Sequence, residues 1–146
     1  MLITLLIIIV VVLVIALIIL YNKPNKKSSG TGRALPGTTT VVVNISLDSN
    51  GIPQQNFNEI ELLPGQTALF AGPADFLIIF KNRKTPNHKI ENKSENGTVV
   101  VKVPDDILKQ TEFVEEYRKN GFLKFDYAIN VNGKELDPPM IIGRNH

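Results

Sequence analysis

The sequence predicts an all-β protein, an antiparallel β-sandwich with one short helix, preceded by a single N-terminal transmembrane helix. The first observation is an apolar stretch from residue 2 to residue 20 that only Thr4 interrupts. The second is a series of about seven short apolar segments behind it, separated by turns that contain Gly or Pro. The third is the absence of cysteine, which excludes disulfide frameworks, zinc–thiolate sites and thiol catalysis.

The apolar stretch contains 19 residues of Leu, Ile, Val, Ala and one Thr, without Gly or Pro. At about 1.5 Å per residue, a helix of this length nearly spans the ~30 Å hydrocarbon core of a bilayer. A cleaved signal peptide would need a charged start and a small-residue cleavage site. No charge precedes Leu2, and Tyr21-Asn22-Lys23 does not fit such a site. A buried core helix of this composition would need a larger protein around it. We therefore expect an uncleaved anchor over residues 1–21.

The residues that follow this stretch are an aromatic side chain and several lysines, which favour the membrane–water interface. The expected interface residues are Tyr21, Lys23, Lys26 and Lys27. The positive-inside tendency would place these lysines, and the domain behind them, in the cytoplasm. Against this, an N-terminal anchor ahead of a small sandwich more often delivers that sandwich outward. We favour the extracytoplasmic (periplasmic) side.

Residues 22–39 are rich in Lys, Ser, Gly, Thr and Pro and show no apolar periodicity. Such a composition predicts a flexible linker between the anchor and a β-sandwich domain over residues 40–146. The lysines of the linker could contact anionic lipid headgroups, or they could be ordinary flanking charges.

Short runs of β-branched and aromatic residues indicate the strands. The predicted strands are TVVVNISL (40–47), EIELL (59–63), the second half of PGQTALFAG (64–72), DFLIIFKN (75–82), TVVVKV (98–103) and FLKFDYAINV (122–131). A helix is predicted over 104–121, because Pro104 and two aspartates suit its start and Asn120-Gly121 suits its end.

Residues 83–97 form a long polar segment between two predicted strands. Connections of this length are often functional, and the alternative is a mobile loop. The possible interaction residues in it are Arg83, Lys84, His88, Lys89 and Lys93. His88 has cationic neighbours that disfavour a bound metal, so a solvated side chain is expected there.

The last strand alternates apolar and polar residues, so one set of side chains is expected to point into the core. That set is Leu123, Phe125, Tyr127 and Ile129. Asn132-Gly133 is the favoured pair for a two-residue hairpin turn. Asp137-Pro138-Pro139 is expected to interrupt or redirect strand pairing. Met140 is expected in the core.

The order of these segments resembles the cupredoxin-like β-sandwich. IELLPGQTALF is similar to that family's strand, Pro-Gly turn and strand, and GFLKFDYAI is similar to its penultimate strand. The resemblance covers about residues 40–143, and an immunoglobulin-like sandwich is the competing assignment. In copper-binding members the resemblance would imply a His near DFLIIF and a Cys after the penultimate strand.

This chain departs from that pattern at the copper ligands. A blue-copper site needs a thiolate and two imidazoles, usually with an axial Met. DFLIIF contains no His, and Asn132-Gly133 stands where the ligand loop is expected. We expect no copper and no other cofactor.

Charge and motifs limit the remaining function classes. Residues 1–40 hold four basic and no acidic residues, so the rest of the chain carries a formal charge of −2 and offers no basic surface for nucleic acid. No phosphate loop or nucleophile elbow is present, so no enzymatic activity is expected.

The hypothesis that fits best is a non-enzymatic accessory or structural subunit of a larger membrane protein complex. Its partners would be the lipid bilayer and other subunits of that complex. One alternative is a metal-handling or redox protein whose ligands would be His88, Met140 and His146. Another is an envelope sensor or adhesion module that binds peptide or glycan.

Overall fold

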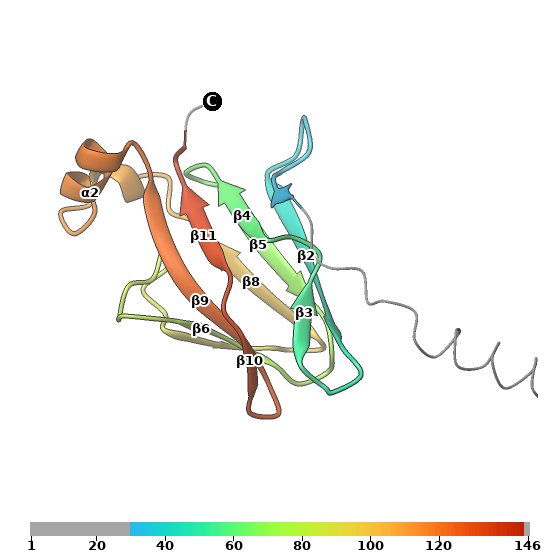
Figure 1. Ribbon diagram of the computed structural model, residues 1–146. Helices are drawn as coiled ribbons and strands as arrows, with labels where there is room; N and C mark the ends of the chain where they lie inside the picture. Colours follow the sequence, from blue (N-terminus) through green and yellow to red (C-terminus); the bar gives the residue numbers. More distant parts are fainter. Residues whose placement is uncertain (1–29, 145–146) are drawn as a thin grey trace, which may run out of the picture.

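The computed structural model describes residues 30–144, which form a β-sandwich of two mixed sheets (Figure 1). The larger sheet has the strand order β1 (Thr31–Gly32), β4 (Glu59–Leu62), β11 (Pro139–Ile142), β9 (Leu123–Val131), β6 (Leu77–Phe80) and β7 (Glu91–Lys93), with β10 (Lys134–Leu136) paired to β9. The smaller sheet has the order β3 (Pro53–Gln55), β2 (Thr40–Leu47), β5 (Thr67–Ala71) and β8 (Thr98–Lys102). The prediction of a two-sheet β-sandwich is confirmed.

The core lies between the two sheets and consists of the alternating inward side chains of their strands. The predicted inward set of β9 is confirmed, because Leu123, Phe125, Tyr127 and Ile129 are all fully buried. β2 contributes Val41, Val43 and Ile45 in the same way, with Val42 and Asn44 exposed between them. A period of two residues places successive side chains on opposite faces of a strand. The sequence pattern therefore indicates correctly which face of these strands is buried.

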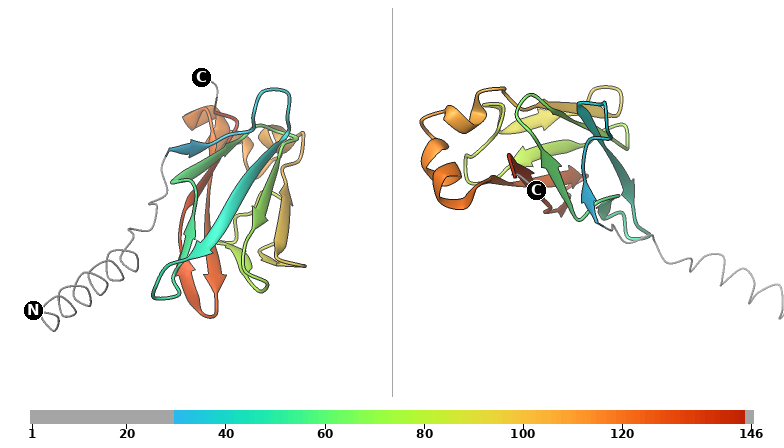
Figure 2. Two further views of the ribbon diagram at one scale, coloured as in Figure 1. Left: turned by 90° about the vertical axis from the view of Figure 1, so that its right-hand side faces the viewer. Right: turned by 90° about the horizontal axis from the view of Figure 1, so that it is seen from above.

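The prediction of antiparallel sheets is wrong for part of the fold. β2 pairs with β5 in parallel, and β4 pairs in parallel with both β1 and β11. The periodicity of a strand shows which face is buried but not the direction of its neighbour. Here the connections cross between the two sheets, so strands distant in the sequence become parallel neighbours (Figure 2).

The prediction of one short helix is confirmed, but its predicted extent over residues 104–121 is wrong. The segment contains a 3₁₀ turn, η1 (Ile107–Lys109), and a separate helix, α2 (Val114–Asn120). Ile107 and Phe113 are both buried, and the chain bends between them so that both reach the core. The predicted end is confirmed, since Gly121 is left-handed with a φ of 74° and donates its amide to the Tyr117 carbonyl.

The predicted linker, residues 22–39, differs from the structure at its C-terminal end. Thr31 and Gly32 form β1, which pairs with Glu59 and Ile60 of β4. Gly32 is required at this point, because an added Cβ would lie 2.4 Å from the Phe57 ring. The ordered sandwich therefore begins before residue 40. The rest of the predicted linker, the predicted anchor and the interface residues Tyr21, Lys23, Lys26 and Lys27 lie outside the described residues.

The C-terminal segment follows its prediction. Asn132 and Gly133, with φ values of 51° and 79°, form the turn between β9 and β10. Asp137 and Pro138 then separate β10 from β11, which begins at Pro139 and pairs with an earlier part of β9 and with β4. Met140 is fully buried in β11, as expected.

Tyr127 connects the two sheets through a buried hydrogen bond. Its hydroxyl donates to Gln55 Oε1 of β3 at 2.8 Å, and its ring packs edge-on against Phe70 at 5.5 Å. Burial raises the pKa of the Tyr127 hydroxyl well above its usual value near 10.

This pKa shift predicts a loss of stability in alkali. Above pH ~10 the unfolded state releases the Tyr127 proton while the folded state retains it, so the free energy of unfolding falls by about 1.4 kcal/mol per pH unit. Below pH ~10 the proton is bound in both states, and Tyr127 contributes no pH dependence. Tyr127→Phe is expected to remove this slope, which denaturant unfolding at a series of pH values would measure. An unchanged alkaline slope in Tyr127→Phe would contradict the assignment.

Candidate interaction surfaces

The segment 83–97 is folded onto the sandwich. It contains β7 (Glu91–Lys93), which pairs with β6, so the interpretation of the whole segment as a connecting loop is wrong. Three of its polar side chains are buried, and each one is hydrogen-bonded. They are Thr85, Asn92 and Ser94. Asn92 and Thr85 bond to backbone carbonyls, which fixes the path of the chain around the predicted interaction residues.

The predicted interaction residues differ in their surroundings. Lys84 is directed toward the protein: its ammonium group contacts Glu116 at 2.6 Å and lies 4.7 Å from the Phe125 ring centroid. Arg83 and Lys89 are exposed, and Lys93 is exposed on β7. His88 is exposed as well, with Nδ1 4.0 Å from a carboxylate oxygen of Glu112. Lys84 thus holds the segment on α2 and β9, while the other four side chains face solvent.

The role of Lys84 predicts a stability effect. Lys84→Met keeps the aliphatic stem and removes the charge, which leaves the partly buried Glu116 carboxylate with the Lys124 amide as donor but without its ionic partner. The free energy of unfolding is expected to fall by about 1–2 kcal/mol. Lys89→Met, a matched change at an exposed lysine of the same segment, is expected to have an effect within about 0.5 kcal/mol. Equal denaturation midpoints for the two variants would contradict this role.

Two of the ligands considered for a metal site, His88 and Met140, do not come together. Met140 is fully buried in β11 beside Phe125, whereas the imidazole of His88 is exposed near Glu112. His146 lies outside the described residues. Within residues 30–144, no group of three or more His, Asp or Glu side chains is arranged to hold a metal ion.

The outer face of the smaller sheet carries almost no charge. Three apolar side chains form a row across it, since Val42 of β2 is level with Leu69 of β5, and Leu69 is level with Val100 of β8. Val42 and Val100 are 46% and 60% exposed. The other outward residues of β2, β5 and β8 are Thr40, Asn44, Ser46, Thr67, Ala71, Thr98 and Lys102. We refer to this surface as the uncharged face; Lys102, at one end of an edge strand, is its single charge.

The outer face of the larger sheet is different. Its strands carry charged side chains, which are Glu59 and Glu61 on β4, Lys124 and Asp126 on β9, and Glu91 and Lys93 on β7. A solvated sheet face normally carries such charges. The contrast between the two faces makes the uncharged face the better candidate for contact with another protein.

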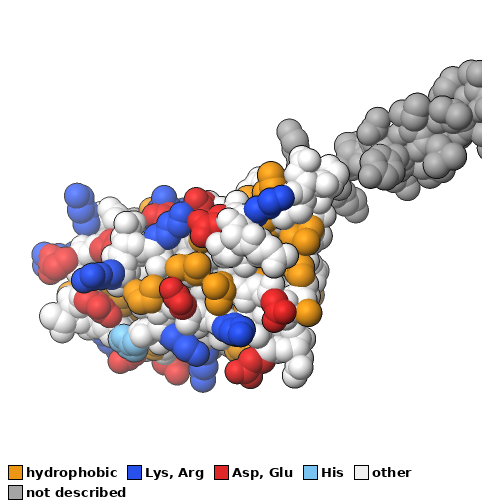
Figure 3. Space-filling view, turned by 90° about the horizontal axis from the view of Figure 1, so that it is seen from below, with side chains coloured by type: hydrophobic (Ala, Val, Ile, Leu, Met, Phe, Trp, Pro, Cys, Tyr) orange, Lys and Arg blue, Asp and Glu red, His pale blue; other side chains and the backbone are white. Residues whose placement is uncertain are grey.

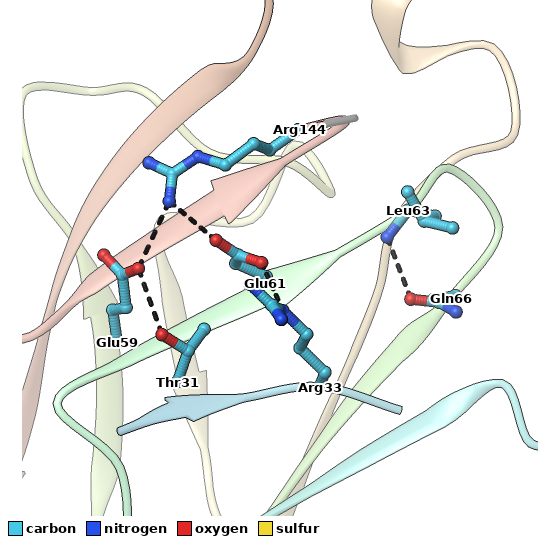
Figure 4. A network of polar contacts seen from close by, with 7 residues as sticks. All are labelled: Thr31, Arg33, Glu59, Glu61, Leu63, Gln66 and Arg144. Atoms are coloured by element: carbon cyan, nitrogen blue, oxygen red, sulfur yellow. Dashed lines mark hydrogen bonds and ion pairs between the residues drawn. The ribbon is translucent and has the colours of Figure 1, made fainter. Parts of the chain in front are cut away.

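A cluster of ion pairs lies at one end of the sandwich (Figure 4). The Glu61 side chain is only 7% exposed and lies between two arginines, with Oε2 2.5 Å from Arg33 Nε and Oε1 2.6 Å from Arg144 Nη1. Arg144 also pairs with Glu59 at 3.4 Å, and Glu59 accepts a hydrogen bond from Thr31. The hydrogen bond to Glu61 raises the pKa of Arg33. The cluster joins β1, β4 and the end of β11.

A pocket of about 490 Å³ adjoins this cluster and is lined by Arg33, Ala34, Glu61, Leu62, Leu63, Gln66 and Arg144. Sequence analysis missed this site. The alternation of Glu59 and Glu61 in EIELL was a usable signal, because it places both carboxylates on one outward face. Their arginine partners come from residues 33 and 144, at the two ends of the described chain, and only the fold brings them together.

Comparison with known proteins does not assign the chain to a family. No protein-family model matches the chain, and no curated protein matches it. Among solved structures, an NMR solution structure of a copper-binding protein in its apo form is similar, with a TM-score of 0.40 and 15% sequence identity. The alignment covers 78% of this chain and 97% of that protein.

In residues 30–144, no helix is long and apolar enough to cross a membrane. The stretch from residue 2 to residue 20 lies outside that range.

Proposed function

We propose that this chain is a single-pass, membrane-anchored accessory subunit of a larger membrane protein complex, without enzymatic activity. The anchor would be the apolar stretch at residues 2–20, and the sandwich would lie on the extracytoplasmic (periplasmic) side. The observation that carries the proposal is the uncharged face, with its row of Val42, Leu69 and Val100. That face would dock on a neighbouring subunit.

The chemistry of this face favours a protein partner. Nucleic acid or an anionic surface would select clustered Lys and Arg, and this face has Lys102 alone. Protein interfaces exclude charged residues from their centre, and the centre of this face is apolar with Thr, Ser and Asn around it. The segment 83–97 offers exposed cations instead, so it would contribute at most to the rim of such an interface.

We further propose that the sandwich is a cupredoxin-like domain that uses its scaffold for docking, not for metal. The sequence resemblance supports this: IELLPGQTALF forms β4, a Pro-Gly turn and β5. Copper added to the purified full-length protein and then removed by gel filtration is expected to leave no stoichiometric metal. One equivalent of retained copper, lost in His88→Ala, would favour the metal-handling alternative.

The docking proposal is tested by purifying the tagged full-length protein from native membranes in mild detergent, followed by mass spectrometry. The expected result is a reproducible, stoichiometric set of membrane protein subunits. Recovery of the chain alone would overturn the proposal. Recovery of soluble peptide or glycan ligands without membrane partners would favour the sensor or adhesion alternative.

A further inference from the structure

Two turns with the same Leu-Pro-Gly sequence occur in the fold, at residues 35–38 and 63–66. In each, the amide of the fourth residue donates to the leucine carbonyl, at 2.9 Å in the first turn and 3.1 Å in the second. Gly37 and Gly65 have φ values of 78° and 81°. Proline followed by a glycine with positive φ is the pattern of a type II turn, which holds the backbone rigidly. We call this pair the twin turns.

The twin turns lie side by side. The first leads into β2 and the second into β5, and these strands pair in parallel from Thr40 and Thr67 onward. The Thr67 amide also donates to the Thr39 carbonyl at 2.9 Å, directly behind the two turns. Both turns therefore project from the same end of the sandwich, where β1 and the end of β11 also lie (Figures 1 and 2).

Each twin turn presents a leucine to solvent. Leu35 is 72% exposed and Leu63 is 48% exposed. Apolar side chains held on rigid, projecting turns gain free energy when they enter an apolar phase, and little ordering entropy is lost because the turns are already fixed.

The opposite end of the sandwich lacks this feature. Its hairpin turns have polar tips, formed by residues 48–51, 96–97 and 132–133. The exposed Leu47 and Ile52 flank the first of these turns and do not occupy its tip. Figure 3, which views the molecule from below, shows acidic and basic side chains spread over this end, with hydrophobic side chains between them. The two ends therefore differ in the polarity of their turns.

The pocket beside the twin turns adds polar groups at the same level. Arg33 and Arg144 line it with side chains 53% and 33% exposed, and Leu63 belongs to the same lining. Guanidinium groups donate hydrogen bonds to phosphate oxygens while their stems cover apolar surface. Because Glu59 and Glu61 balance the two charges, the site suits a zwitterionic headgroup as well as an anionic one.

The position of the predicted anchor indicates what covers this end. The apolar stretch ends at Leu20, about ten residues before Thr31, which is a reach of roughly 35 Å in an extended chain. Thr31 begins β1, two residues before Arg33. A domain tethered so closely at this end remains within contact distance of the bilayer surface.

We propose that the twin turns rest on the lipid bilayer, with Leu35 and Leu63 inserted at headgroup depth and Arg33 and Arg144 facing lipid phosphates. This inference rests on the proposed anchor. It orients the molecule, because β2 and β5 then run away from the bilayer and the uncharged face points sideways toward a neighbouring subunit.

The absence of cysteine allows a direct test. Full-length Leu35→Cys and Leu63→Cys are labelled with an environment-sensitive fluorophore and reconstituted into phosphatidylcholine vesicles. Quenching by headgroup spin-labelled lipid is then measured. Ser49→Cys, in the opposite turn, and Val100→Cys, on the uncharged face, are the exposed controls. At positions 35 and 63 we expect a blue-shifted emission and at least about twofold stronger quenching than at either control.

The outcomes separate the possibilities. Lipid quenching that persists on dilution of the protein in the bilayer supports the proposal. Quenching equal to that at Ser49→Cys, or a blue shift that disappears on dilution and so reports a second copy, overturns it. Flotation of the vesicles after alkaline extraction tests the anchor separately. A chain that floats while positions 35 and 63 remain in water refutes only the lipid contact, and a chain that does not float refutes the anchor and, with it, this inference.

Discussion

Phe125→Ala is expected to lower the free energy of unfolding by about 3–5 kcal/mol, the usual cost of removing a fully buried aromatic side chain. Phe125 is fully buried near the start of β9 and packs edge-on against Phe113, with ring centroids 5.4 Å apart. Its ring also contacts the ammonium group of Lys84. The substitution would therefore weaken three sets of contacts, those of the core, those of Phe113 just before α2, and those of Lys84 in the segment 83–97.

Chemical denaturation of the full-length protein in detergent, followed by far-UV circular dichroism, would measure this effect. Phe122→Ala is the matched control, because Phe122 lies three residues away and is only partly buried beside Arg144. Its expected cost is about 1–2 kcal/mol, less than that of a fully buried ring. Equal losses of unfolding free energy in the two variants would contradict a central packing role for Phe125.

A charge on the uncharged face is expected to abolish docking while the fold is retained. Val100→Glu places a carboxylate beside Leu69, in the row that ends at Val42, where a docked partner would remove the charge from water. Recovery of partner subunits is expected to fall at least about tenfold, which corresponds to 1.4 kcal/mol of binding free energy. Because Val100 is exposed on an edge strand, the free energy of unfolding should change by less than about 1 kcal/mol.

Quantitative mass spectrometry of parallel purifications provides the measurement. Val114→Glu is the control, since it makes the same change at an exposed valine on α2, away from this sheet. That variant is expected to recover partners at the wild-type level. If Val100→Glu retains its partners, the uncharged face is not the docking surface. If both variants lose them, the effect is not specific to this face.

Most strands of the sandwich could be predicted from the sequence, because the alternation of apolar and polar residues within a short segment indicates a strand. TVVVNISL and FLKFDYAINV alternate with a period of two, and β2 and β9 bury the expected sides. The short strands β3, β7 and β10 were missed as separate elements. Each has three residues and polar composition, and each is held by hydrogen bonds to a longer neighbour.

The candidate surfaces were predictable only in part. The polar segment 83–97 was predicted as an interaction element. Its Lys84 instead forms an ion pair with Glu116 of the same domain. The uncharged face depends on which strands become neighbours, since Val42, Leu69 and Val100 form a row only through the pairing of β2, β5 and β8. The same holds for the twin turns, whose shared Leu-Pro-Gly sequence is visible in the chain but whose adjacency is not.

The sequence by itself determined the all-β class, the buried side of the main strands, the hairpin turn at Asn132-Gly133 and the place of Met140 in the core. These features follow from side-chain periodicity and from backbone preferences that act over a few residues. The tertiary structure decided strand direction, the break between η1 and α2, and the ion pairs that join Arg33, Glu61 and Arg144. These depend on contacts between residues distant in the chain, which no local pattern specifies.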